Sequence, residues 1–257
     1  MKVQNHKIGC FIVSRTSSKR LPNKVLKLVR GKSIIQHIIE RAKLVSGVDI
    51  IVLCTSTDKS DDVLESVAKR NNIKVFRGSL KDVLARYLGA AERFGVETFA
   101  VFSGDNVFTD PGIVSDAIDQ LVKGGLDFIN IPDDTIVCGG GCYCISTGAL
   151  KKVCQLKKSD DTEIIAPYFL DSNTFKTENL KIKPVFQRPE IRLTLDYPED
   201  LVLIRKVFDE FDTDTNNISL ERIIKLLDKK PDIININSFR RKDWTSNQLS
   251  RRVIKNL

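Results

Sequence analysis

The sequence predicts an α/β protein with a mainly parallel central sheet and helices on both faces. Short apolar runs alternate with stretches whose apolar residues recur at helical spacing, which is the order expected of a parallel sheet. The chain has 257 residues, of which 42% are hydrophobic and 29% charged, as in ordinary globular proteins. This length is sufficient for one large domain with a substantial core.

Five apolar runs mark the strands of the first half, at residues 8–13, 49–55, 74–76, 98–102 and 128–131. Three helices lie between them, because apolar residues share one face in each stretch: Ile34, Ile35, Ile38, Ile39 and Ala42, then Val63, Leu64, Val67 and Ala68, then Val83, Leu84, Tyr87, Leu88 and Ala91. Asp61 and Asp62 suit a helix start, and Asp110 before Pro111 resembles an N-cap followed by a proline at the first helical position.

The pattern changes after Asp133. Short strands are expected at residues 141–145, 182–187 and 192–195, and a final helical region at residues 199–229. No linker or repeat forces a boundary, so we expect one domain over residues 1–257.

Composition limits the compartment and the partners. No apolar run approaches the roughly 20 residues that span a bilayer, and the N-terminal apolar stretch is short for a signal peptide, so we expect a cytoplasmic protein without a membrane partner.

The six cysteines show no disulfide framework. Cys138, Cys142 and Cys144 lack the usual zinc-ligand spacing and a nearby His, which disfavours a metal site there. The net charge is +8, and residues 240–257 form a basic tail, which we interpret as a solvated terminus or an interface segment rather than a nucleic-acid site.

The stretch from Ser14 to Lys24 carries the most information. It follows the apolar residues 10–13 and holds four cations within ten residues. A solvated basic loop and a site for an oxygen-rich anion such as a triphosphate both fit this composition. Because ligands of parallel sheets bind beyond the carboxyl ends of the strands, Arg15, residues 55–58, Arg77 and Asp105 are expected at one edge.

Two aspartates are candidate metal ligands. Asp105 follows an apolar strand and Gly104, a residue that lets a ligand approach the backbone. Asp196 precedes Pro198 and suits either a metal ligand or a helix N-cap. Mg²⁺ commonly takes one or two carboxylates together with phosphate oxygens and water.

The order of residues in the basic stretch points to a family. Arg15, Ser18, Arg20, Leu21, Pro22 and Lys24 reproduce the signature R-x-x-S-x-R-L-P-x-K, and the segments 55–62, 75–79, 82–87, 104–105 and 193–201 follow in the family's order. The chain thus resembles the CMP-sugar synthetase type of cytidylyltransferase, which includes the acylneuraminate and KDO enzymes. It is most similar to the spore-coat polysaccharide branch.

This resemblance implies the Rossmann-like, GT-A-like fold of nucleotide-diphospho-sugar transferases and transfer of CMP from CTP to a small anionic acceptor. It implies a nucleotide-binding half at residues 1–132, an acceptor-side half at residues 133–239, and a homodimer. It assigns catalysis to Arg15, Lys24, Asp105 and Asp196, with Mg²⁺ on Asp105 and Asp196. It assigns CTP binding to Ser14, Arg15, Thr16, Ser17, Lys24, Arg77, Gly78 and Ser103.

The departures from the family lie on the acceptor side. Gly141 and Tyr143 stand where the spore-coat branch usually has Asp and Glu, and Ile164 stands where a His often follows the position of Glu163. A sugar acid that attacks through a hydroxyl benefits from a general base, whereas a phosphate or phosphonate is already an ionised nucleophile. We therefore hypothesise a phosphate or phosphonate acceptor rather than a common nonulosonic acid.

Other classes remain alternatives. A metal-dependent glycosyltransferase normally shows Asp-x-Asp where this chain has Asp105-Asn106-Val107. Uridylyl- and guanylyltransferases usually carry a glycine-rich loop in place of residues 14–20. A non-catalytic nucleotide- or nucleic-acid-binding protein would use the basic tail. A Ser-His-Asp or Cys-His hydrolase is disfavoured, because neither His6 nor His37 is expected at the carboxyl edge.

Overall fold

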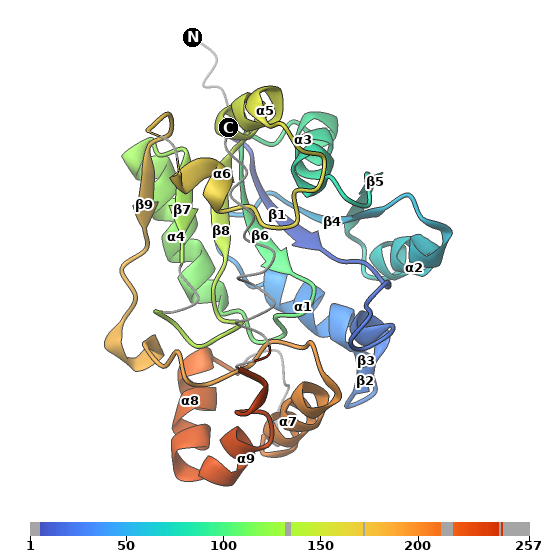
Figure 1. Cartoon of the computed structure of the whole chain (residues 1–257), viewed down its shortest axis with the longest axis vertical. Helices are drawn as coiled ribbons and strands as arrows, with labels where there is room; N and C mark the ends of the chain where they lie inside the picture. Colours follow the sequence, from blue (N-terminus) through green and yellow to red (C-terminus); the bar gives the residue numbers. More distant parts are fainter. Residues whose placement is uncertain (1–5, 132–134, 172, 212–217, 242, 244–257) are drawn as a thin grey trace.

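The computed structural model describes residues 6–131, 135–171, 173–211, 218–241 and 243. A seven-stranded sheet with the order β5-β4-β1-β6-β8-β7-β9 forms its centre (Figure 1). The strands are β1 (Ile8–Val13), β4 (Ile50–Ser56), β5 (Lys74–Gly78), β6 (Thr98–Ser103), β7 (Phe128–Asn130), β8 (Tyr143–Ser146) and β9 (Thr177–Asn179). Only β8 pairs antiparallel, with β6 and with β7, so the sheet is mainly parallel as predicted.

Helices cover both faces of the sheet because the residues of each strand alternate between them. Cys10 and Ile12 of β1 pack into one core, and Phe11 packs into the other. The first core contains apolar residues of α1 (Ile34–Ala42), α2 (Asp62–Arg70) and α4 (Pro111–Gly124), and the second those of α3 (Val83–Phe94), α5 (Thr147–Leu156) and α6 (Pro167–Leu170). The predicted α/β architecture is confirmed.

Several local predictions also hold. The first strand has the predicted limits, and α4 begins at Pro111 with the carboxylate of Asp110 accepting the backbone N–H of Gly112 at 2.9 Å. Asp110 also accepts the N–H of Leu220 at 2.9 Å, which ties the C-terminal helices to the sheet. These are α7 (Pro198–Asp209), α8 (Leu220–Lys229) and α9 (Pro231–Asn235), which lie together at one end of the molecule (Figure 1).

Two strand predictions for the second half are wrong. Residues 182–187 hold the short 3-10 helix η3 (Pro184–Phe186) instead of a strand, because Pro184 starts a helical turn. Residues 192–195 form no strand; their one ladder contact is an isolated bridge between Cys138 and Arg192. The predicted helical region 199–229 holds two helices, α7 and α8, and residues 212–217 between them lie outside the described part.

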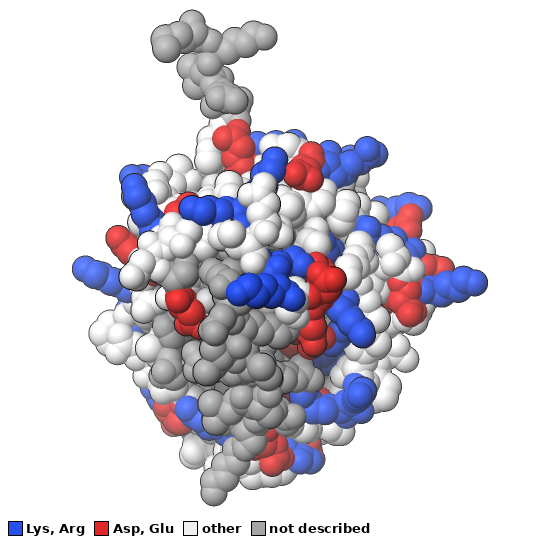
Figure 2. Space-filling model, turned by 45° about the horizontal axis from the view of Figure 1, so that its top comes forward, with Lys and Arg blue, Asp and Glu red and all other residues white. Residues whose placement is uncertain are grey.

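The remaining elements are short. They are the 3-10 helices η1 (Lys24–Leu26) and η2 (Lys59–Asp61) and the two-stranded sheet of β2 (Leu28–Val29) and β3 (Lys32–Ser33). No helix within the described ranges is long and apolar enough to cross a membrane. On the face shown in Figure 2, Lys and Arg side chains are interspersed with Asp and Glu. Most of the basic tail lies outside the described residues, so its interpretation stays a prediction. The division into two halves and the homodimer also stay predictions.

Candidate active site

The basic stretch leaves the carboxyl end of β1 and is held there by Asp61. The backbone N–H and the hydroxyl of Thr16 both donate to Asp61 Oδ1, at 2.7 and 2.8 Å, and Ser56 Oγ donates to Asp61 Oδ2. Burial raises the pKa of Asp61, but these hydrogen bonds lower it below its usual value. Asp61 stands at the start of α2, as predicted, yet its side chain makes no cap hydrogen bond there and fixes the basic stretch instead.

The structure shows a packing requirement for a glycine at position 104. Its N–H donates to Val13 O at 2.8 Å, and a Cβ on it would lie 2.7 Å from that oxygen and 2.8 Å from Ser14 Oγ. Such contacts are too short for any side chain. The glycine therefore lets the loop after β6 pack against the end of β1 and Ser14.

Lys24 brings the two candidate metal ligands together. Its Nζ donates to Asp105 Oδ2 at 2.9 Å, to Asp196 Oδ1 at 3.0 Å and to Leu195 O at 2.8 Å. The two acidic loops are also joined through the backbone, because Leu195 N donates to Asp105 O at 2.9 Å. Ser103 Oγ donates to the other oxygen of Asp105. Residues that lie about 170 positions apart in the chain thus converge on one ammonium group.

The opposite charges of this cluster stabilise one another. Burial raises the pKa of Asp196, but the charges of Lys24 and Arg20 lower it to about 2. Burial lowers the pKa of Lys24, and the two carboxylates raise it above its ordinary value. Arg20 Nη2 also donates to Asp196 Oδ1. The three groups are therefore charged at neutral pH.

The oxygen ligands suit a magnesium ion. Asp105 Oδ2, Asp196 Oδ1 and Leu195 O already surround a cation, the ammonium of Lys24. Mg²⁺ commonly binds one or two carboxylates and completes its shell with phosphate oxygens and water. No group of three or more His, Cys, Asp and Glu side chains is placed to hold a metal within the described ranges, the cysteines of residues 138–144 included.

Arg15 points across to the second half of the chain. Its guanidinium forms an ion pair with Glu163 in the segment between α5 and α6. Ser14 is buried, and its hydroxyl has no hydrogen-bond partner among the described residues, while Ser17 is exposed on the same stretch. Binding of an anion by Ser14, Arg15 and Ser17 stays a prediction.

Arg77 and Gly78 lie at the end of β5, two strands away from β1. The Arg77 guanidinium donates to Asp62 at 2.6 Å, to Ser56 O at 2.9 Å and to Asp58 O at 2.8 Å. The structure thus groups Lys24, Ser103, Asp105 and Asp196 and places Arg77 in a separate ion cluster beside α2. Nucleotide binding by Arg77 and Gly78 stays a prediction.

Sequence reasoning missed three residues that surround Asp196. Arg20 belongs to the quoted signature, so its charge was a usable signal. Asp200 is the third residue of α7, a position from which an acid reaches back to the helix start, and its Oδ2 accepts the N–H of Tyr197 at 2.9 Å. Tyr197, not Asp196, is the N-cap residue of α7, so the N-cap interpretation of Asp196 is wrong. No sequence motif pointed to Arg192, which falls in the strand predicted at residues 192–195.

The two histidines lie away from this site. His6 precedes β1 at the opposite edge of the sheet, where its ring accepts from or donates to Thr98. His37 is buried in α1 and contacts Val29 O at 2.9 Å.

Comparisons with known proteins agree with the fold and identify the family. A protein-family model described as cytidylyltransferase matches residues 10–229. The chain is 32% identical to the uncharacterized protein MJ1063 of Methanocaldococcus jannaschii, over 90% of this chain and 95% of that one. It is 26% identical to the spore coat polysaccharide biosynthesis protein SpsF of Bacillus subtilis, over 86% and 94%. A solved cytidylyltransferase from Leptospira borgpetersenii superposes with a TM-score of 0.82 at 25% identity, covering 89% of this chain and 96% of that one. This chain therefore belongs to the cytidylyltransferase family of nucleotidyltransferases.

Proposed function

We propose that the enzyme transfers CMP from CTP to a small anionic acceptor in a magnesium-dependent reaction that releases pyrophosphate. The observation that carries this proposal is the contact of Lys24, in the basic stretch, with both Asp105 and Asp196. A site with paired carboxylates for a divalent cation and neighbouring cations for phosphate oxygens suits a nucleoside triphosphate.

The chemistry needs positioning more than covalent catalysis. An acceptor oxygen attacks the α-phosphorus of CTP and forms a new P–O bond, while the bond from that phosphorus to the bridging oxygen breaks. The bridging oxygen leaves with the electron pair as part of pyrophosphate. Arg15 and Lys24 offset the negative charge that develops on this leaving group. The hydroxyls of Ser14 and Ser17 are assigned to the triphosphate, and Arg77, Gly78 and Ser103 to the nucleoside. Thr16 contributes by fixing this stretch, because its hydroxyl donates to Asp61.

Asp105 and Asp196 would hold the magnesium ion. A bound Mg²⁺ neutralises phosphate charge and orients the reacting groups. Asp105 is held by the hydroxyl of Ser103, and Asp196 by Lys24 and Arg20, so both carboxylates are ordered. Ordered ligands lower the entropic cost of binding the cation.

The acceptor side supports a phosphate or phosphonate acceptor. Glu163, which directly precedes the altered position Ile164, has its carboxylate engaged in an ion pair with Arg15. Ile164 and Ala166 follow it, and both histidines lie elsewhere. An ionised phosphate or phosphonate oxygen attacks without a general base.

The test is ³¹P NMR of the purified enzyme with CTP and Mg²⁺ and one acceptor at a time: a nonulosonic acid, an octulosonic acid, phosphocholine and 2-aminoethylphosphonate. The expected result is pyrophosphate together with a new anhydride phosphorus signal, for the phosphate or phosphonate acceptor only. Turnover with the sugar acids would overturn the choice of acceptor. Pyrophosphate formation that the variant Asp196→Asn retains fully would overturn the proposed site.

A further inference from the structure

Asp200 is the most heavily hydrogen-bonded carboxylate near the site, and the proposed reaction leaves it without a role. Its side chain is fully buried. Oδ2 accepts the backbone N–H groups of Asp196 at 2.8 Å and of Tyr197 at 2.9 Å. A carboxylate that holds the main chain of Asp196 restricts where the Asp196 side chain can lie.

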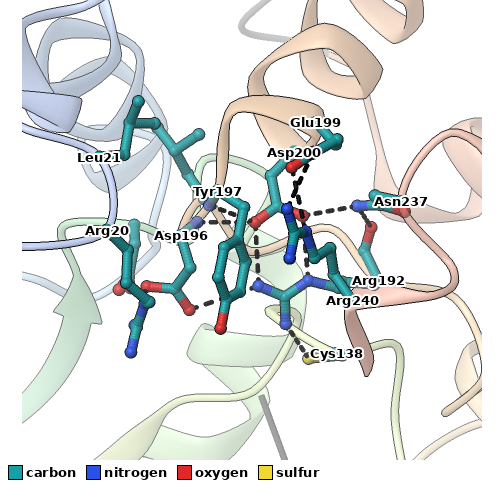
Figure 3. A network of polar contacts seen from close by, with 12 residues as sticks. Arg20, Leu21, Cys138, Arg192, Asp196, Tyr197, Glu199, Asp200, Asn237 and Arg240 are labelled. Atoms are coloured by element: carbon teal, nitrogen blue, oxygen red, sulfur yellow. Dashed lines mark hydrogen bonds and ion pairs between the residues drawn. The ribbon is translucent and has the colours of Figure 1, made fainter. Parts of the chain in front are cut away.

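Arg192 completes this arrangement from the other side. Its guanidinium binds Asp200 through two parallel hydrogen bonds, from Nε to Oδ1 at 3.0 Å and from Nη2 to Oδ2 at 2.9 Å. The same Nη2 lies 3.4 Å from Asp196 Oδ2 (Figure 3). Asp196 therefore presents Oδ1 to Lys24 and turns Oδ2 to Arg192, so its two oxygens have different partners.

Asn237 extends the contacts to the C-terminal segment after α9. Its Nδ2 donates to Asp200 Oδ1 at 2.8 Å and to Arg192 O at 3.1 Å. Five hydrogen bonds thus end on the Asp200 carboxylate. Buried polar groups that are satisfied to this degree fix a single arrangement of the side chains that they join.

The charges explain why this arrangement suits a metal ligand. Arg192 and Asp200 form a buried pair with no net charge, so they orient Asp196 without adding a strong field of either sign. Arg20 and Lys24, which contact the outward oxygen, are less buried than Arg192. The inward oxygen is held by the rigid pair and the outward oxygen by side chains nearer to solvent.

We infer that Asp200, together with Arg192 and Asn237, is a positioning unit that holds Asp196 Oδ1 toward the bound divalent cation. This inference rests on the proposed function, because it takes Asp196 as a metal ligand. Asp200 touches neither CTP nor metal and acts through Asp196. Partners of metal ligands of this kind typically contribute about ten- to a hundredfold to metal affinity.

The substitution Asp200→Asn tests this role with little change in volume. An amide has one acceptor oxygen where the carboxylate has two, and each carboxylate oxygen accepts at least two of the five hydrogen bonds, so at least two donors lose their acceptor. Asp110→Asn is the matched control: Asp110 is also a buried carboxylate at a helix start, and it accepts three backbone N–H groups, of Gly112, Ile113 and Leu220. It lies outside the proposed site.

The measurement is the affinity for CTP by titration calorimetry without an acceptor, once with Mn²⁺ and once with EDTA. The ratio of the two affinities reports the coupling between metal and nucleotide and needs no turnover. For Asp200→Asn we expect the ratio to fall at least about tenfold relative to the wild type, with the EDTA affinity within about threefold. Asp110→Asn is expected to keep the wild-type ratio.

The outcomes separate the two claims. A wild-type enzyme whose CTP affinity does not depend on Mn²⁺ would overturn the proposed metal site itself. A metal-dependent wild type with equal ratios for Asp200→Asn and Asp110→Asn would overturn the positioning role alone. If Asp200→Asn does not fold, Asn237→Ser removes one donor to Asp200 from the far side, and an unchanged ratio in that variant would contradict the inference.

Discussion

Lys24 and Asp105 form a direct ion pair, with Nζ 2.9 Å from Oδ2, and the same ammonium lies 3.0 Å from Asp196 Oδ1. The side chain of Lys24 is 12% exposed. A lysine placed between two carboxylates stabilises them when they have no other cation. The same lysine competes with a metal ion for their oxygens, which gives it two opposed effects.

Replacing Lys24 by Met separates these effects. Removal of the ammonium leaves the two carboxylates facing each other, so Mn²⁺ should bind the protein without nucleotide about tenfold more tightly. Turnover should fall by about a hundredfold or more, because the leaving pyrophosphate loses a cation. Mn²⁺ binding by electron paramagnetic resonance and steady-state rates check the two parts. Lys27→Met is the control outside the carboxylate contacts, and weaker Mn²⁺ binding in Lys24→Met would refute the competition.

Glu163 restrains Arg15, so its neutralisation should free that guanidinium for CTP. We expect Glu163→Gln to bind CTP about two- to fivefold more tightly without an acceptor, the range of a partly exposed ion pair. Titration calorimetry measures this affinity. Glu178→Gln is the control, because it removes an equivalent charge on β9, away from Arg15, and should leave the affinity for CTP unchanged. Unchanged or weaker binding of CTP by Glu163→Gln would show that the ion pair does not compete with the nucleotide.

The low pKa of Asp196 predicts a specific loss of stability in acid. The folded pKa of about 2 lies below the ordinary value of 3.8, so the stabilisation is complete above pH 4 and is lost as the pH falls through 2. The difference corresponds to about 2 kcal/mol. Urea unfolding of wild type and Asp196→Asn from pH 5 to 2 measures it, with Asp119→Asn on the exposed face of α4 as control. Parallel curves for wild type and Asp196→Asn would contradict the assignment.

The close approach at Gly104 gives a structural prediction. Gly104→Ala places a methyl group 2.7 Å from Val13 O, which forces the loops after β1 and β6 apart. We expect a loss of about 1–3 kcal/mol in unfolding free energy together with weaker CTP binding. Gly148→Ala on α5, where nothing lies within 4 Å, is expected to change stability by less than about 0.5 kcal/mol. Denaturant unfolding measures the stability of both variants, and titration calorimetry measures their affinity for CTP. Similar losses in the two variants would show that the close contact at Gly104 has no special effect.

The first half of the chain was predictable because its signals are local. The apolar run of β1 ends where Ser14 begins, and Asp110 and Pro111 mark a helix start without help from distant residues. The carboxyl-edge rule then placed Arg15 and Asp105 at one edge of a parallel sheet before any contact was known. Lys24 was identified from the signature, although its contact with Asp196, far away in the sequence, could not be predicted.

The second half was less predictable because its structure depends on partners. Residues 182–187 and 192–195 have the apolar composition of strands, but neither has a neighbouring strand to extend, and Pro184 starts a helical turn. Gly139, with a φ of 91°, packs its backbone against Thr194, so the 191–194 segment is held by loop contacts. The role of Arg192 depends on Asp200 and Asn237, which no periodicity in the sequence relates to it.

Thermal unfolding with CTP, UTP, GTP or ATP, each with and without Mg²⁺, distinguishes a cytidylyl transferase from the alternatives before any acceptor is known. A ligand that binds the native state alone stabilises it by RT ln(1 + [L]/Kd), about 2.7 kcal/mol at a hundredfold excess over Kd. We expect a large shift with CTP that Mg²⁺ increases, and small shifts with the other three nucleotides. Equal shifts with all four nucleotides, or none with CTP, would contradict the proposed function.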